Sequence, residues 1–188
     1  ISRTGWSGEL GFEIYLDDRR YGDQLWERIM EAGKPYNIKP AAPNTIRSIE
    51  GGLLSYVSDI TLEDSPFVIG VDRFMSLDQE DFIGRDALLK IRAEGVKRRL
   101  VGVEIAGDPL EATNEHFWSI LSAGEKIGHV TRCVYSPRLE KNIGWANVAI
   151  EFAEVGTELV IDSSVGQLAA TVCEAPWIKP EIKIPALD

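Results

Sequence analysis

The residues best suited to nucleophilic or metal chemistry are few and scattered in this chain. Cys133 and Cys173 are forty positions apart and form no CxxC pair, and His116 and His129 are the two histidines. This is too little to predict a zinc site or a disulfide framework. Phosphate-binding and nucleophile-elbow patterns (GxxxxGK[ST], GxGxxG, GxSxG) are also missing from the sequence. We therefore expect reduced thiols, no metal site and no hydrolase-type nucleophile.

A carboxylate in a glycine-rich opening is the better candidate for ligand binding. Glu9 lies between Gly8 and Gly11, and glycines let the backbone approach a flat ligand closely. Trp6 and Tyr56 offer flat apolar surfaces on which such a ligand can stack. The residues alone leave a plainer alternative open, in which Glu9 is an exposed loop carboxylate and both aromatics belong to a core.

Charge and composition exclude several partners. The chain has 188 residues, of which 44% are apolar and 27% charged, and its formal net charge is −10. Such a charge disfavours nonspecific binding to nucleic acid or to anionic lipid. No apolar run reaches the roughly 18 residues needed to span a bilayer, and no signal peptide opens the chain. We expect a cytoplasmic protein that binds neither nucleic acid nor membranes, and the abrupt start at Ile1 predicts a fragment.

The elements that would position these residues change in character near residue 97. Before it, the patterns predict a half-buried strand at 12–16, a buried strand at 67–71, and helices at 23–32, from Pro43 onward and at 85–93. After it, short strands are expected at 101–105, 117–121, 127–134, 143–148, 157–162 and 167–173. Strands at this spacing are typical of a small antiparallel barrel. On the second helix, Arg47 and Glu50 are expected to form an exposed intrahelical pair.

Four blocks in sequence order resemble the glycine-cleavage T-protein family of aminomethyltransferases. Residues 3–14 read RTGWSGELGFEI and resemble the family's RTGYTGEDGFEI, and 81–88 read DFIGRDAL and resemble DFIGREAL. Two further blocks match more loosely. The first resembles LRLEAG…Y…D…SP and consists of Arg47–Gly52 with Tyr56, Asp59, Ser65 and Pro66. The second resembles the barrel signature GxVTSxxxSPxxxxNIA and consists of Gly128–Thr131 with Ser136, Pro137 and Asn142–Gly144. Four blocks in register make a chance match improbable.

The resemblance implies an α+β fold in two parts. Residues 1–97 would be the C-terminal part of the ferredoxin-like T-protein catalytic α/β region, whose N-terminal half is missing, and 98–188 the C-terminal antiparallel β-barrel. It also implies transfer of a methyl or aminomethyl unit from a small-molecule donor to tetrahydrofolate. For a true T-protein it implies a lipoyl carrier protein as partner.

The resemblance also implies roles for five residues. Glu9 would accept hydrogen bonds from the nitrogen-rich edge of the pterin, with Trp6 and Tyr56 as stacking surfaces. Asn44 stands where the family has an arginine, so it can donate a hydrogen bond but not a bidentate cationic fork. Arg138 lies in a barrel turn that faces the family's central cavity, although surface exposure remains open. The family's aspartate near the reactive folate nitrogens has no counterpart here, so no catalytic residue is assigned and the chain alone is expected to turn over little.

The subfamily and two alternatives are open at this point. Trp6–Gly8, Pro43–Asn44 and 49–55 resemble dimethylsulfoniopropionate demethylase and related methyl-removing proteins more closely than T-proteins. One alternative is the folate-binding tail of a flavin-dependent amine oxidase such as dimethylglycine dehydrogenase. The other is a non-enzymatic folate-binding iron–sulfur assembly factor, whose KGCYxGQE motif is replaced here by TGWSGE at 4–9.

Overall fold

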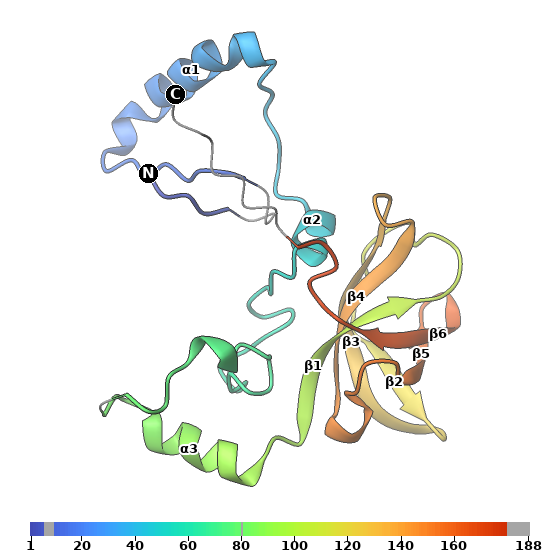
Figure 1. Cartoon of the computed structure of the whole chain (residues 1–188). Helices are drawn as coiled ribbons and strands as arrows, with labels where there is room; N and C mark the ends of the chain where they lie inside the picture. Colours follow the sequence, from blue (N-terminus) through green and yellow to red (C-terminus); the bar gives the residue numbers. More distant parts are fainter. Residues whose placement is uncertain (6–9, 80, 180–188) are drawn as a thin grey trace.

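The main body of the molecule is a closed barrel of six antiparallel strands (Figure 1). The structure, a computed structural model, describes residues 1–5, 10–79 and 81–179. The strands are β1 (Arg98–Ile105), β2 (Trp118–Ser122), β3 (Glu125–Ser136), β4 (Lys141–Ala149), β5 (Glu158–Ser163) and β6 (Gly166–Cys173). Their order around the barrel is β1-β4-β3-β2-β5-β6, and β6 pairs with β1 to close it. The six strands expected from the sequence are therefore confirmed.

Alternating side chains fill the barrel. The interior is apolar because one face of every strand contributes branched residues, and its buried members include Val103, Ile120, Val130, Val148 and Ile161. The turn between β2 and β3 consists of Ala123 and Gly124, both with positive φ. Two positive φ values in a two-residue hairpin match the right-handed twist of the flanking strands, which explains the tight connection.

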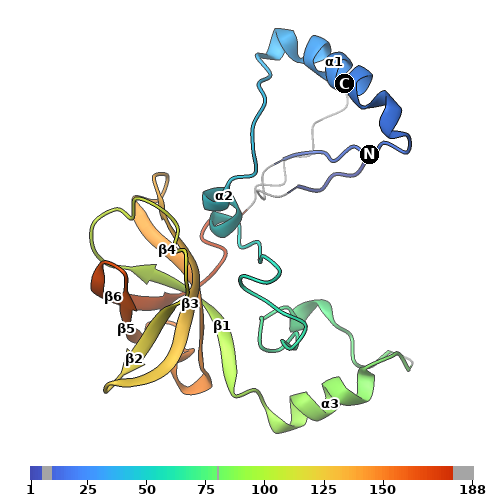
Figure 2. The same ribbon diagram turned by 180° about the vertical axis from the view of Figure 1, so that it is seen from behind.

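Strand β4 is buried on both faces, which connects the barrel to the rest of the chain. Ala146 and Val148 point into the barrel, whereas Ile143 and Trp145 belong to a second apolar cluster outside it. In that outer cluster they join Ile49 of helix α2 (Thr45–Glu50). Both views place α2 beside the barrel near β4 (Figures 1 and 2). The barrel wall therefore serves as the platform on which α2 is positioned.

The three helices expected from the sequence are confirmed, with small shifts at their ends. Helix α1 covers Gly22–Gly33 and α3 covers Arg85–Glu94, and α3 begins and ends at glycines with positive φ. Helix α2 (Thr45–Glu50) ends at its C-cap Gly51, and Gly52 follows with positive φ. Short 3-10 turns occupy Arg19–Tyr21, Lys34–Tyr36, Asp72–Phe74 and Ile150–Phe152.

Two expected strands are absent from the described part of residues 1–97. Residues 12–16 are exposed and make one isolated bridge, between Ser2 and Glu13. Residues 67–71 form consecutive turns because the amides of Val68 and Ile69 bond back to the carbonyl of Ser65. The apolar run at 67–71 predicts burial, but it does not specify a strand with which to pair. Helix α1 has no fully buried residue, although Leu25, Ile29 and Met30 on its apolar face are partly covered.

The architecture is α+β, with helices preceding a C-terminal antiparallel barrel, as the sequence predicts. In both views α1 lies well away from the barrel, and α2 lies between them (Figures 1 and 2). No helix in the described residues has both the length and the apolar character to cross a membrane. Two of the four blocks that carry the resemblance, at Arg47–Pro66 and Gly128–Gly144, meet where α2 and the loop after it pack on β3 and β4.

Candidate functional site beside the barrel

Helix α2 is attached to the barrel through a buried carboxylate. Glu50 is 3% exposed, and it accepts hydrogen bonds from Ser136 Oγ at 2.5 Å and from Arg47 at 3.2 Å. The expected exposed pair of Arg47 and Glu50 is therefore wrong for Glu50. The ion pair exists, but burial against Ser136 at the end of β3 makes its carboxylate a link between helix and barrel. A buried carboxylate requires such partners, since an unpaired one would cost several kcal/mol.

A second buried carboxylate holds the loop after α2. The Asp59 side chain is fully buried and forms an ion pair with Arg132 of β3. Arg132 Nε donates to Asp59 Oδ2 at 2.8 Å, and its other nitrogens donate to Ser48 Oγ at 3.2 Å and to the Leu53 carbonyl at 3.0 Å. One guanidinium thus binds three points of the segment 48–59. We call Asp59 and Arg132 the clamp.

A bulge in β3 places a further residue of the clamp. The pairing of β3 with β4 shifts register between Val130 and Arg132, which leaves Thr131 as the extra residue. Thr131 Oγ1 donates to Asp59 Oδ1 at 2.7 Å, while its carbonyl accepts from Asn114 Nδ2 at 3.1 Å. Bulges re-aim side chains at the edges of functional sites. Here the bulge turns the hydroxyl of a barrel residue outward to the loop.

The clamp holds a short loop that presents two exposed apolar side chains. Tyr56 is 60% exposed and Val57 is 70% exposed. Val57 has φ +77°, and a β-branched residue in this left-handed region is strained. The loop keeps this conformation because Asp59 Oδ2 accepts from the Ser55 amide at 2.8 Å. Tyr56 is therefore not a core aromatic; it lies on the surface, on a loop that these hydrogen bonds hold.

Asn44 has a structural role that the sequence did not indicate. Its side-chain oxygen accepts from the amides of Ile46 at 2.9 Å and Arg47 at 3.3 Å, so it is the N-cap of α2. Asparagine is among the best N-cap residues because it satisfies amides that have no partner within the helix. Across the described residues, the amide nitrogen of Asn44 has no hydrogen-bond partner, and it remains available to donate.

Two substitutions separate these two halves of the Asn44 side chain. Asn44→Ala removes the cap, and we expect it to lower the free energy of unfolding by about 1 kcal/mol. Asn44→Asp retains the accepting oxygen and should keep most of that stability, although it removes the donor. Urea unfolding followed by circular dichroism measures both. An Ala variant as stable as the parent would contradict the capping role.

The remaining predicted site residues belong to different segments of the chain. Arg138 lies in the turn between β3 and β4, its side chain is exposed, and it engages in an interaction of its own. Glu9 and Trp6 lie outside the described residues. Asn44 thus lies at the start of α2, Tyr56 in the loop after α2, and Arg138 in the turn after β3. Their roles in ligand binding stay predictions.

A polar cavity lies between the clamp and the loop that precedes β2. Its volume is about 350 Å³, and its lining includes Pro43, Thr45, Ser55, Ser58, Asn114, His116, Thr131 and Arg132. Residues on either side of Asn44 and of Tyr56 therefore contribute to its wall. The neighbouring His129 stacks on Phe117 at 4.7 Å, and burial lowers its pKa. Within residues 1–5, 10–79 and 81–179, no three His, Cys, Asp or Glu side chains are grouped to hold a metal ion.

This arrangement can bind and orient a polar ligand, but it contains no nucleophile paired with a base. Reasoning from the sequence missed Arg132 and Asn114, whose contacts join positions 17 to 84 residues apart. One signal was available: Arg132 is a charged residue in the apolar run 127–134 predicted as a strand. A charge at such a position implies a buried partner.

Two family models match the chain. The GCVT N-terminal domain matches residues 1–79, and the glycine cleavage T-protein C-terminal barrel domain matches residues 98–179. Together they match most of the chain, and three of the four sequence blocks lie within the matched residues, while the block at 81–88 lies between them. The barrel model begins at the first residue of β1.

Curated relatives and a solved structure agree with these matches. An aminomethyltransferase of Thermoanaerobacter sp. (strain X514) is 38% identical over 97% of this chain and 49% of its own length. That of Alkaliphilus oremlandii is 40% identical over 92% of this chain and 46% of its own length. The crystal structure of glycine cleavage system aminomethyltransferase T from Bartonella henselae has the same fold, with a TM-score of 0.83 at 22% identity over 95% of this chain and 49% of that one. The chain spans about half the length of the curated relatives it matches, and it belongs to the glycine-cleavage T-protein family.

Proposed function

We propose that this chain is part of an enzyme that transfers a one-carbon unit, methyl or aminomethyl, to tetrahydrofolate. The observation that carries the proposal is the presence of both T-protein domain types in order on one chain, with 38% identity to curated aminomethyltransferases. The folate supplies the one-carbon chemistry when it is bound. The task of these residues is then to bind the pterin and to hold the donor beside it.

In this proposal the pterin lies against the surface that the clamp supports. Tyr56 is exposed on a hydrogen-bonded loop and offers a stacking face, and the amide nitrogen of Asn44 can donate to the folate or to the one-carbon donor. Glu9 would accept from the pterin ring N–H and 2-amino group, the role that the resemblance assigns to it. Arg138 would contact the ligand from the barrel turn. The catalytic residue stays unassigned, and we propose that this part of the protein contributes binding more than turnover.

Tetrahydrofolate binding tests the proposal. We expect the 188-residue chain to bind the cofactor, and Glu9→Ala to weaken binding by about tenfold to a hundredfold, because a paired charge-assisted contact is lost. Glu9→Gln should be intermediate, since it keeps an acceptor without the charge. Fluorescence titration under argon measures each dissociation constant. The matched control is Glu94→Ala, which removes an exposed carboxylate of α3.

The outcome against the proposal is equally definite. If Glu9→Ala binds as tightly as the parent and as Glu94→Ala, the carboxylate does not hold the pterin. If the parent does not bind tetrahydrofolate at all, the folding state checked by circular dichroism decides whether the binding site or the fold is at fault.

The one-carbon unit that is transferred, methyl or aminomethyl, distinguishes the demethylase group from the T-proteins. The matching relatives are named aminomethyltransferase, whereas Trp6–Gly8 and Pro43–Asn44 resemble the demethylase group. We propose that 5-methyltetrahydrofolate is the product if the demethylase resemblance holds, and 5,10-methylenetetrahydrofolate with ammonia if the protein is a T-protein. A T-protein would also require a lipoyl carrier as partner. We further propose a domain boundary at residues 97 and 98, where β1 begins.

A further inference from the structure

A larger cavity lies between one end of the barrel and the loop that precedes β2. Its wall consists of loop residues 107–116 together with Trp118, Leu168 and the turn between β5 and β6. The loop and this turn are at the same end of the barrel, because Ser119 near the start of β2 pairs with Asp162 near the end of β5. The cavity has a volume of about 780 Å³, which falls within the range of small-molecule sites.

Much of the wall of this cavity is the end of the barrel core. Trp118 belongs to that core, and Leu110 and Leu168 pack against it while they remain partly exposed. The loop approaches this surface closely at Gly107, where φ is +113° and a Cβ would lie 3.5 Å from Leu168 Cδ2. The apolar lining residues are Pro109, Leu110, Ala112, Trp118, Val165 and Leu168. A hydrocarbon group that enters the cavity therefore leaves water for contact with apolar side chains.

The formally charged side chains that line the cavity are all acidic. They are Asp108, Glu111 and Glu115, and neither lysine nor arginine is among the lining residues. All three residues are exposed, and within residues 1–5, 10–79 and 81–179 their carboxylates form no ion pair. A cavity lined by charges of one sign attracts the opposite charge. Its charge and its apolar wall together are complementary to a cation that has a hydrocarbon body.

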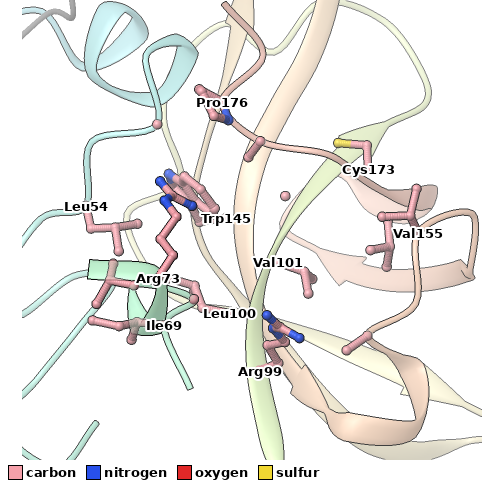
Figure 3. Close-up of a pocket in the computed structure, with 17 residues that line it drawn as sticks. Leu54, Ile69, Arg73, Arg99, Leu100, Val101, Trp145, Val155, Cys173 and Pro176 are labelled. Carbon is pink, nitrogen blue, oxygen red and sulfur yellow. The ribbon is translucent and has the colours of Figure 1, made fainter. Parts of the chain in front are cut away.

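A smaller cavity beside β1 provides a contrast (Figure 3). Its volume is about 360 Å³, and its charged members are Arg73 and Arg99. Figure 3 shows their guanidinium groups well apart, on different sides of β1. A cation is repelled there, so this cavity serves as an internal control for a ligand that is selected by its positive charge.

From these observations we propose that the cavity at the barrel end binds a small organic cation, an ammonium group with an apolar body. The hydrocarbon part lies against Leu110, Trp118 and Leu168, and the ammonium group lies on the side of the acidic loop. A bare inorganic or methylated ammonium ion gains the second contact but not the first. The proposal does not rest on the proposed one-carbon function, although residues 113–116 of the loop also line the polar cavity beside the clamp.

Binding of hexylammonium to the 188-residue chain at pH 7 tests this site. We expect it to shift the amide signals of Gly107 and Leu168 and the indole N–H signal of Trp118 in ¹H–¹⁵N spectra, with saturation on titration. The amide signals of Gly70 and Gly102, which line the arginine-containing cavity, should stay in place. Raising the salt concentration should weaken the binding, because the three carboxylates are exposed.

Two further probes separate the charge from the hydrocarbon body. 1-Hexanol has nearly the same shape as hexylammonium without the charge, and we expect its dissociation constant to be about tenfold higher. Methylammonium has the charge without the hydrocarbon chain, and it should also bind at least about tenfold more weakly.

Variants assign the binding to the cavity. The triple variant Asp108→Asn/Glu111→Gln/Glu115→Gln should raise the dissociation constant for hexylammonium by about tenfold, since each exposed carboxylate contributes a modest attraction. The matched control is Glu125→Gln, which removes an exposed carboxylate from the turn between β2 and β3, at the opposite end of the barrel. It should leave the binding unchanged. Because all four residues are exposed, we expect folded spectra from both variants.

Four results would overturn the proposal. They are equal binding of 1-hexanol and hexylammonium, equal binding of methylammonium and hexylammonium, undiminished binding in the triple variant, and shifts at Gly70 and Gly102 without shifts at Gly107 and Leu168. Tetrahydrofolate binding is measured on the same samples, so failure of this site is distinguished from failure of the proposed one-carbon function.

Discussion

Replacing Arg132 by Met should lower the free energy of unfolding by about 3–5 kcal/mol, since it leaves a buried charge without its ion-pair partner. Asp59 would keep two donors, the Ser55 amide and Thr131 Oγ1. These cannot replace the guanidinium, which is 12% exposed and also binds Ser48 and Leu53. Urea unfolding followed by tryptophan fluorescence measures the loss.

A matched control separates this effect from the general loss of a surface cation. Lys141 and Glu104 form an ion pair at 2.7 Å, and their side chains are 53% and 37% exposed. Exposed pairs contribute at most about 1 kcal/mol, so Lys141→Met should change stability little. If Arg132→Met were no more destabilising than Lys141→Met, the clamp would not hold the loop and the support of Tyr56 would need another explanation.

The double variant Arg132→Met/Asp59→Leu extends the argument from stability to function. Replacing both members of a buried pair by apolar residues often restores much of the stability that a single replacement removes. The Ser55 amide would nevertheless lose its acceptor, and the strained φ of Val57 would lose the contact that sustains it. We therefore expect a folded protein with a relaxed Tyr56 loop. Weaker tetrahydrofolate binding in that variant would identify the clamp as a positioning device.

The barrel strands were predictable because the pattern that identifies each strand lies within the strand itself. Period-two alternation, as at Val101, Val103 and Ile105, places one face inward without any knowledge of the partner strand. The run 67–71 has no such alternation, and its amides bond to Ser65, so the same composition produced turns. Helix α1 has a clear amphipathic pattern, yet the pattern does not say what packs against it.

The site was predictable only in part because its contacts are long-range. The resemblance drew attention to Glu50, Asp59 and Ser136, and the structure shows that these residues fasten α2 and its loop to the barrel. Glu50 and Ser136 are 86 positions apart, and no periodicity connects them. Arg132 was not singled out, since a side chain's partner across a bulge depends on register. Residues of a family motif can thus position the surface that binds a ligand without contacting the ligand themselves.

The two thiols should react far more slowly in the folded protein than in the unfolded chain. Burial raises the pKa of Cys133 from 9.0 to about 12, and burial likewise raises the pKa of Cys173 to about 11. The thiolate is the reactive form, so at pH 8 its fraction should fall by about a thousandfold at Cys133 and a hundredfold at Cys173. Iodoacetamide labelling followed by mass spectrometry, with and without urea, measures both rates.

The same shifts fix the sign of the stability change at high pH. Because the folded pKa of Cys133 is raised, its thiol is protonated in both states below about pH 9, and its contribution to stability is fully present there. Between about pH 9 and 12 the unfolded chain loses the proton first, so stability should decline with rising pH. Cys133→Ser should flatten that decline, whereas an unchanged slope would contradict the assignment.

The rate at which iodoacetamide labels Cys133 in the folded protein measures how often the loop before β2 opens. Cys133 is fully buried, and its amide donates to Asn114 Oδ1 at 2.8 Å. Asn114 also donates to the carbonyls of His116 and Thr131, so one side chain fastens this loop over the bulge. Asn114→Ala should therefore speed labelling of Cys133 by about tenfold, since it removes bonds that local opening must break. Labelling of Cys173, which lies outside this network, should stay unchanged. Equal acceleration at both cysteines would mean that the substitution destabilises the whole barrel and that the loop does not open by itself.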